Sequence, residues 1–312
     1  LRGADAIILG KTNAAEFGYG GIGHNPLFPT TCNPWDLTRT SGGSSAGSAA
    51  AVSAGICPIA LGSDGGGSVR LPAAFTGIVG VKPSMGRIPL WPGCRDETLP
   101  GASGWESIEH YGPLARTVAD AALFLKVVCG PDMRDRHSLP DEGLDWTTAA
   151  TTARPRPLRI AWCPQWGTVP ADPEVLEIAE NAAFGFADNS KSNIETVNVP
   201  FGDIIDSYRA IVAMETDLVG LRNLALGQEE KISRSLRGLL SRRWTAEEFT
   251  AGVIARKAAV NAMARLMERF DLLLTPTAPV TAFPIGQDGP GKIGGILVDD
   301  DAWTPALYPA NL

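Results

Sequence analysis

Two glycine–serine turns constrain the fold of this chain more than any other feature of its sequence. The first turn spans residues 41–48 and the second spans residues 65–70. Between them the sequence predicts one alanine-rich helix over residues 45–54 and one apolar strand over residues 58–62. A helix followed by a strand can return the chain to the same edge of a sheet, so we expect the two turns to meet there.

The residue types in the two turns suit acyl transfer. Consecutive glycines let backbone N–H groups point into one concavity, because no Cβ stands in the way. A serine at the end of such a run places its hydroxyl beside those donors, which can stabilise the oxyanion that forms when the hydroxyl attacks a carbonyl. From the spacing alone, a nucleophile is as well supported as a pair of structural turns or a phosphate-binding nest.

Apolar runs and helical patterns alternate along the rest of the chain. The sequence predicts further strands over residues 6–10, 78–81, 158–162 and 270–276, and further helices over residues 69–75, 117–129, 173–187, 204–226, 230–241 and 246–269. A long ordered loop is predicted over residues 18–43. Strands alternating with helices indicate an α/β fold with a largely buried sheet.

Composition excludes several classes of protein. A hydrophobic share of 44% excludes a disordered chain, and a net charge of −7 argues against nucleic acid as a partner. Nowhere do about 18 apolar residues follow one another, so no membrane span is predicted. Five scattered cysteines without a C-x-x-C pair argue against a disulfide framework or a zinc ribbon and favour a reducing, cytoplasmic location. No metal site and no organic cofactor are indicated.

Two weaker patterns are interpreted structurally. Residues 18–23 match G-x-G-x-x-G, but a dinucleotide site needs a strand directly before the motif and a helix directly after it. Because neither is predicted, a loop is the better interpretation. The basic stretch over residues 231–243 has near-helical spacing on an acidic chain, so it is interpreted as one solvated helix face.

The segments 42–50 and 61–87 resemble the amidase signature family. The likeness continues in stretches that cover most of the chain and include residues 10–13, 16–17, 33–35, 112–120 and 271–277. The resemblance implies an α/β amidase signature fold, with a mixed β-sheet core covered by helices on both faces. It also implies a single domain over residues 1–312. Within it, residues 131–157 are predicted to be an exposed connection because they are polar, proline-rich and charged, and residues 158–270 are predicted to be a helix-rich middle region.

The resemblance further implies a serine hydrolase with a Ser–cis-Ser–Lys triad, in agreement with the small number of histidines, three in all. Position by position, Ser68 matches the nucleophile and Ser44 matches the bridging serine, which follows a cis peptide bond. Gly65, Gly66 and Gly67 match the oxyanion loop, and Ser45 matches a supporting position beside the Gly43–Ser44 bond. Asp64 and Arg70 flank the oxyanion loop and are interpreted as structural braces.

The chain departs from the family pattern at both ends. The catalytic lysine of the family would precede Leu1, and neither Lys11 nor Lys82 aligns with it. The closing sheet segment of the family would follow Leu312. We therefore expect a fragment that is incomplete at both ends and not competent by itself.

Three functions follow from these observations. The first is an amidase that hydrolyses a small-molecule carboxylic amide in a linear substrate to acid and ammonia or amine, in a family whose members often form homodimers. The second is the glutamine-hydrolysing subunit of an amidotransferase of the Glu-tRNA(Gln)/Asp-tRNA(Asn) type. Such subunits usually carry an Arg-Tyr-Gly type stretch where this chain has Ile88 to Trp91, so the first is preferred. The third is a catalytically inactive protein with an amidase fold. Trp91, Trp105 and Tyr111 are expected in a pocket or in packing.

Overall fold

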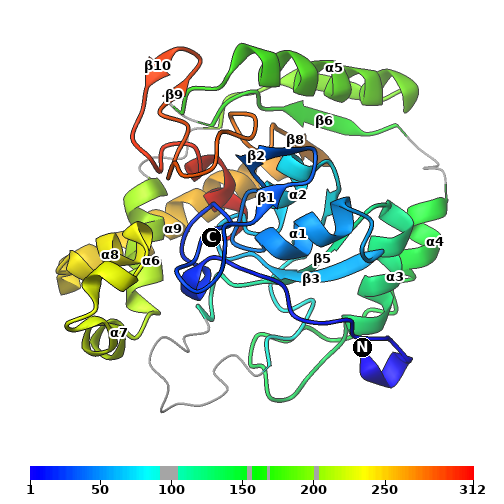
Figure 1. Ribbon diagram of the computed structural model, residues 1–312. Coiled ribbons are helices and arrows are strands. Elements are labelled where there is room, and N and C mark those ends of the chain that lie inside the picture. The colour runs from blue at the N-terminus through cyan, green and yellow to red at the C-terminus, as the bar shows by residue number, and fades with distance from the viewer. Residues whose placement is uncertain (92–104, 153–156, 167–168, 200–203) are drawn as a thin grey trace. The chain divides into compact units, whose positions relative to one another are not determined.

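The computed structural model describes residues 1–91, 105–152, 157–166, 169–199 and 204–312 (Figure 1). The chain divides into two compact units, each built from segments distant in sequence. Unit 1 comprises Leu1–Thr152, Val212–Trp244 and Asn311, and unit 2 comprises Ala153–Ile211, Thr245–Ala310 and Leu312.

Unit 1 contains an antiparallel sheet in the order β3-β5-β4, formed by Ile59–Ser63, Tyr111–Ala115 and Val79–Gly80. In its register Ile59 pairs with Ala115, and Ser63 pairs with Tyr111. A separate hairpin pairs β1 (Cys32–Asn33) with β2 (Asp36–Thr40). The end of β3 therefore lies beside the start of β5, and both lead into the loops that form the site described below.

Helices α1 (Ala46–Ser53) and α2 (Arg70–Thr76) pack on this sheet (Figure 1). Their shared core is small and almost fully buried. It consists of alanine and valine side chains around one leucine of β5: Ala49, Val52, Val69, Ala73 and Leu114. Helix α1 ends before Gly55, whose φ of 77° is the left-handed conformation that glycine adopts without strain. Burial of the two helices fixes the turns at their N-termini, where both candidate serines lie.

The remaining elements of unit 1 are mostly short. Helix α3 contacts all three strands of the sheet, and α7 packs against α8 through Leu221, Ala225, Leu236 and Leu240. Their bounds are η1 Arg2–Ala4, η2 Glu16–Gly18, α3 Val118–Val128, α4 Trp146–Thr151, α7 Leu218–Ala225, η3 Glu229–Lys231 and α8 Arg234–Ser241. Helix α6, Ile204–Met214, begins in unit 2 and ends in unit 1.

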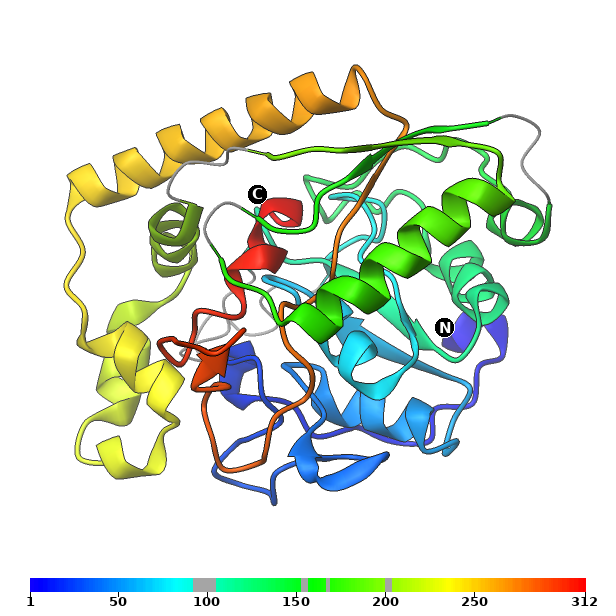
Figure 2. The same cartoon turned by 90° about the horizontal axis from the view of Figure 1, so that it is seen from above.

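Unit 2 is a parallel sheet between two helices (Figure 2). Strands β7 (Asn193–Thr196), β6 (Arg159–Trp162) and β8 (Leu272–Leu274) lie in that order. Helix α5 (Pro173–Asn189) packs against Leu272 and Leu274 through Ala187, and α9 (Ala246–Met267) packs against Leu273 through Ala259. Successive leucines of β8 thus face different helices, as expected for a strand covered on both sides. The smaller elements are β9 Lys292–Ile293, β10 Ile296–Leu297 and η4 Pro305–Ala310.

The predicted α/β fold is confirmed, and three of the local predictions are wrong. The loop predicted over residues 18–43 contains the hairpin of β1 and β2. Residues 6–10 are not a strand: Ile7, Ile8 and Leu9 are exposed by 87%, 54% and 70%, and no described strand pairs with them. The helix predicted over 204–226 is two helices, because Asp217 accepts a hydrogen bond from Gly220 N and starts α7 as a new helix. The sequence patterns also did not predict β5, β7, β9, β10 or α4.

Candidate active site

The first serine turn precedes α1 and is held by the N-terminal segment of the chain. The peptide bond between Gly43 and Ser44 is cis, as the family resemblance implies. Ala15 N donates to Ser44 O at 3.1 Å, and Gly47 N donates to the main-chain oxygen of Asn13 at 2.9 Å. Ser44 is only 4% exposed, so this serine is almost completely buried.

The second turn follows β3 and is organised around Asp64, whose side chain is inaccessible to solvent. Its carboxylate accepts hydrogen bonds from Gly67 N at 2.7 Å and Val69 N at 3.1 Å. It also forms a two-pronged ion pair with Arg70, with Nε at 3.0 Å and a terminal nitrogen at 2.8 Å. One buried carboxylate therefore determines the course of the main chain on both sides of Ser68.

Asn311, from the far end of the sequence, completes this network. Its Nδ2 donates to Asp64 O at 2.8 Å and to Asp64 Oδ1 at 3.0 Å, and its Oδ1 accepts from Arg70 at 2.5 Å. Burial alone would raise the pKa of Asp64, but the Arg70 guanidinium and the N–H donors of Asn311 and Gly67 hold that pKa well below its usual range. Asp64 is thus a carboxylate that supports the loop, as the sequence analysis expected of a brace.

Ser45 connects the two turns. Its hydroxyl donates to Ser63 O at 3.2 Å and accepts from Ser63 N at 3.1 Å, so it bridges to the last residue of β3. Its main-chain N donates to Ser68 O at 3.3 Å. Because these bonds join positions before and after the second loop, they bring the two serine turns together as predicted.

Ser44 and Ser68 line one cavity of about 250 Å³. The walls combine hydroxyl groups, one glycine of the second turn, a carboxyl group and several apolar side chains. They are Ala14, Phe17, Gly18, Ser44, Ser45, Ser63, Gly65, Ser68, Leu90, Trp105, Glu109 and Tyr111. A cavity that combines hydroxyl and carboxyl groups with apolar and aromatic side chains suits a small polar ligand.

The predicted glycines occupy different places around this cavity. Gly65 lines it, and a Cβ at this position would lie 2.7 Å from the Trp105 ring, so only glycine fits. The N–H of Gly67, one of the predicted oxyanion donors, instead donates to Asp64. Gly43 packs against the 18–23 loop, where a Cβ would lie 2.6 Å from Ile22 O. That loop lies in contact with the serine turn, and no helix follows it.

The aromatic wall of the cavity is held by a buried hydroxyl that the sequence analysis missed. Trp105 Nε1 donates to Thr216 Oγ1 at 2.9 Å, and the Tyr19 hydroxyl lies 2.5 Å from the same oxygen. The Tyr19 and Trp105 rings meet edge to face at 4.9 Å. Of the three aromatics singled out from the sequence, Trp105 and Tyr111 line the cavity. Trp91 instead lies half exposed beneath the Arg134 guanidinium.

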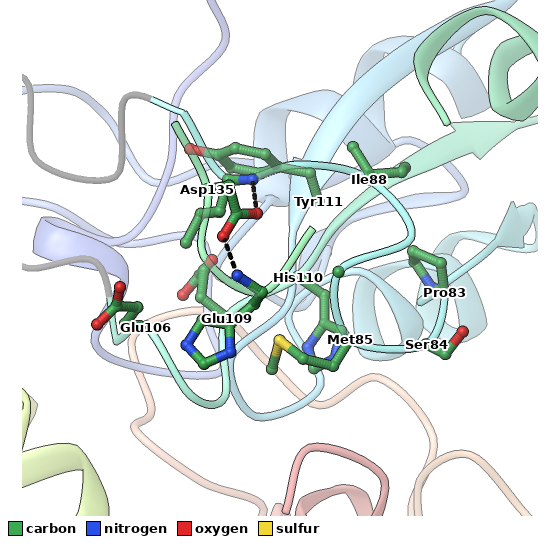
Figure 3. Close-up of a pocket in the computed structure, with 12 residues that line it drawn as sticks. Pro83, Ser84, Met85, Ile88, Glu106, Glu109, His110, Tyr111 and Asp135 are labelled. Atoms are coloured by element: carbon green, nitrogen blue, oxygen red, sulfur yellow. Dashed lines mark hydrogen bonds between the residues drawn. The ribbon is translucent and has the colours of Figure 1, made fainter. Parts of the chain in front are cut away.

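Glu109 and Tyr111 also line a second hollow of about 10 Å³, drawn in Figure 3. There the Asp135 carboxylate accepts hydrogen bonds from Leu90 N and His137 N. Burial raises the pKa of Glu109 to about 7, although its hydrogen bond with Ser63 partly opposes that effect and the Asp64 charge adds to it. Burial likewise lowers the pKa of His110 to about 4, so the imidazole is neutral at pH 7.

A cluster of metal-ligating side chains and a membrane-spanning helix are both absent from the described residues. In those ranges no group of three or more His, Cys, Asp and Glu side chains could hold a metal ion. Each helix in the same part of the chain is too short or too polar to cross a lipid bilayer.

Comparison with known proteins identifies the family. All of residues 1–312 match the family model described as Amidase. An acylamidase from Rhodococcus erythropolis is 35% identical over 100% of this chain, and a glutamyl-tRNA(Gln) amidotransferase subunit from Lactiplantibacillus plantarum is 32% identical over 92% of it. The aligned chain spans 64% and 62% of the lengths of these two relatives. The crystal structure of a bacterial aryl acylamidase of the amidase signature enzymes aligns with a TM-score of 0.86 at 30% identity, covering 99% of this chain and 65% of that one. The chain therefore belongs to the amidase signature family.

Proposed function

We propose that the protein is an amidase that hydrolyses a carboxylic amide through an acyl-enzyme at Ser68. The observation that supports this most directly is that Ser44 and Ser68 line a single cavity, on turns joined by hydrogen bonds of Ser45. Membership of the amidase family supplies the chemical class. The half-buried position of Ser68, in contrast to the nearly inaccessible Ser44, suits a nucleophile that a substrate must reach.

The proposed reaction has two steps. Ser68 Oγ attacks the amide carbonyl while its proton passes to Ser44 and on to a neutral lysine, which the family resemblance implies ahead of Leu1. The negative charge that develops on the carbonyl oxygen is stabilised by main-chain N–H groups of the Gly65–Ser68 turn. The C–N bond then breaks, the amine leaves with a proton, and water hydrolyses the Ser68 ester to release the acid.

A fluorophosphonate probe tests this assignment in the full-length protein. We expect labelling of the wild type and loss of labelling in Ser68→Ala, because the probe needs an activated serine oxygen. Ser44→Ala should slow labelling strongly, since it interrupts the proton path. Ser53→Ala is the matched control: its hydroxyl lies on α1 but donates to Thr76 O, away from the cavity, and labelling should be unchanged. Undiminished labelling of Ser68→Ala would overturn the proposal.

Two other outcomes separate the alternatives. A strict requirement for glutamine, together with co-purification of a tRNA-binding partner, would favour an amidotransferase component, the class to which the Lactiplantibacillus plantarum relative belongs. No labelling of the wild type and no hydrolysis of any amide would favour a catalytically inactive member of the family.

A further inference from the structure

The cavity wall carries one side chain that the proposed reaction does not use, the carboxyl group of Glu109. Glu109 lies two residues before β5 and lines the same cavity as Ser44 and Ser68. A Cβ placed on Gly65 would lie 3.0 Å from Glu109 Oε2, so this carboxyl rests against the first residue of the oxyanion turn. Its position is therefore next to the place where the carbonyl of a substrate would bind.

The groups around Glu109 do not neutralise its charge. Ser63 gives it a hydrogen bond, and the other titratable groups that interact with it are Asp64, Tyr19 and Tyr111, which are acidic. The nearby cation Arg70 is paired with Asp64 instead. Lys82, another cation of this region, interacts with Asp64 and His110, and in the described part of the chain no salt bridge joins Glu109 to a Lys or Arg.

An ionised carboxylate in this position would oppose the proposed reaction. Negative charge develops on the carbonyl oxygen in the transition state, and a second negative charge a few ångströms away in a poorly solvated cavity raises the energy of that state. A positive charge on the substrate would remove this repulsion and pair with the carboxylate at the same time. The cavity thus favours a substrate that brings its own cation.

We propose that Glu109 binds the ammonium group of an amide substrate whose acyl part carries an amino group one or two carbons from the scissile carbonyl. This inference rests on the proposed amidase function. The short distance between Glu109 and Gly65 sets the position of the amino group, because the carbonyl oxygen must lie at the turn and the ammonium must lie at the carboxylate. Ala14, Phe17 and Leu90 leave apolar surface for the rest of the substrate.

A matched pair of substrates tests the proposal: alanine p-nitroanilide and propionyl p-nitroanilide, which differ only in the amino group. In the full-length wild type we expect a higher kcat/KM for alanine p-nitroanilide. Glu109→Gln should lower the ratio of the two kcat/KM values by about 10- to 100-fold, the range for losing a hydrogen bond to a charged group. The same variant should speed turnover of the propionyl substrate, because the repulsion is removed. Loss of folding would slow both substrates, so this opposite response identifies a specific role.

The pH dependence of the ratio provides a second readout. In the wild type the ratio should fall as the pH drops below about 7, because protonation removes the charge of Glu109, and in Glu109→Gln it should be flat. Taking the ratio cancels the titration of any catalytic base shared by both substrates. Glu106→Gln is the control, because Glu106 pairs with Arg136 and does not line the cavity with the serines.

Each outcome bears on one of the two proposals. A protein that is labelled at Ser68 but whose ratio does not respond to Glu109→Gln, or that prefers the propionyl substrate, overturns the role of Glu109 alone. A protein in which Ser68 is not labelled and neither anilide is hydrolysed overturns the proposed function, and the role of Glu109 with it.

Discussion

The Asp64–Arg70 pair offers a quantitative test of how the oxyanion turn is held. Asp64→Asn keeps the shape of the side chain but removes its charge and gives it an NH₂ group that cannot accept hydrogen bonds. Gly67 N, Val69 N and two Arg70 nitrogens all donate to this carboxylate, so at least one donor loses its acceptor. The Arg70 side chain, 18% exposed, loses its ion pair with this carboxylate.

Removing one partner of a buried ion pair lowers the free energy of unfolding by about 3–5 kcal/mol. Because Arg70 is partly exposed, we expect a loss at the low end of this range, about 3 kcal/mol. For a chain of 312 residues, with an unfolding entropy of about 2.1 cal/mol/K per residue, that corresponds to a fall in Tm of about 5 °C. Urea unfolding followed by tryptophan fluorescence measures the loss at pH 7. Because the folded pKa of Asp64 is lowered, its contribution is present above the unfolded pKa near 4 and is lost as the pH falls below that value. The difference in the free energy of unfolding between wild type and variant should therefore become smaller as the pH falls below about 4.

Two further variants make the test specific. Asp36→Asn removes an aspartate that also pairs with an arginine, Arg39, but on an exposed strand, and the urea midpoint should not change. Asp64→Asn combined with Arg70→Met should recover part of the stability, since removing both charges leaves no unpaired ion. If Asp64→Asn unfolds at the same urea concentration as the wild type, the turn does not depend on this network.

Two other substitutions probe the packing of the site by the same urea unfolding. Thr216→Val should lower the free energy of unfolding by about 1–3 kcal/mol, because it removes the hydroxyl that pairs with Trp105 and Tyr19. Thr216→Ser keeps the hydroxyl and should be about as stable as the wild type. Equal losses in both variants would show that the hydroxyl is not the cause. Gly47→Ala should also cost about 1–3 kcal/mol, because the new Cβ would lie 2.6 Å from a main-chain nitrogen of the N-terminal segment. Gly185→Ala, in helix α5 with open space around it, should be neutral or stabilising, and a loss there would show that the effect is not steric.

Local patterns predicted the elements whose signals lie within a few residues. Helix α9 has the capping box that Thr245 and Glu248 indicate, with both reciprocal hydrogen bonds. Strand β5 was missed because Gly112 and Pro113 normally interrupt strands. Glycine is needed at position 112, because a Cβ there would lie 1.9 Å from Val81 O. Pro113 still takes part in the sheet, because its carbonyl oxygen accepts a hydrogen bond from Val81 N.

The site was predictable only where its residues form a motif. The two serine turns were recognisable from their glycines, and their convergence followed from the helix and strand between them. Glu109 and Asn311 have no such signal, because their roles depend on contacts with residues 44 and 247 positions away, Gly65 and Asp64. The strand predicted over residues 6–10 failed for the opposite reason: an apolar run does not reveal whether a neighbouring strand is available to pair with it.

The hydrogen bonds between Asn311 and Asp64 also affect the order in which parts of the protein can fold during synthesis. A ribosome adds about 5–20 residues per second, so the asparagine emerges more than ten seconds after the aspartate that it anchors. During that interval the loop that carries Ser68 lacks the hydrogen bonds from Asn311, even if helices α1 and α2 have already formed. Newly synthesised protein should therefore acquire its final loop geometry late, only once Asn311 has left the ribosome.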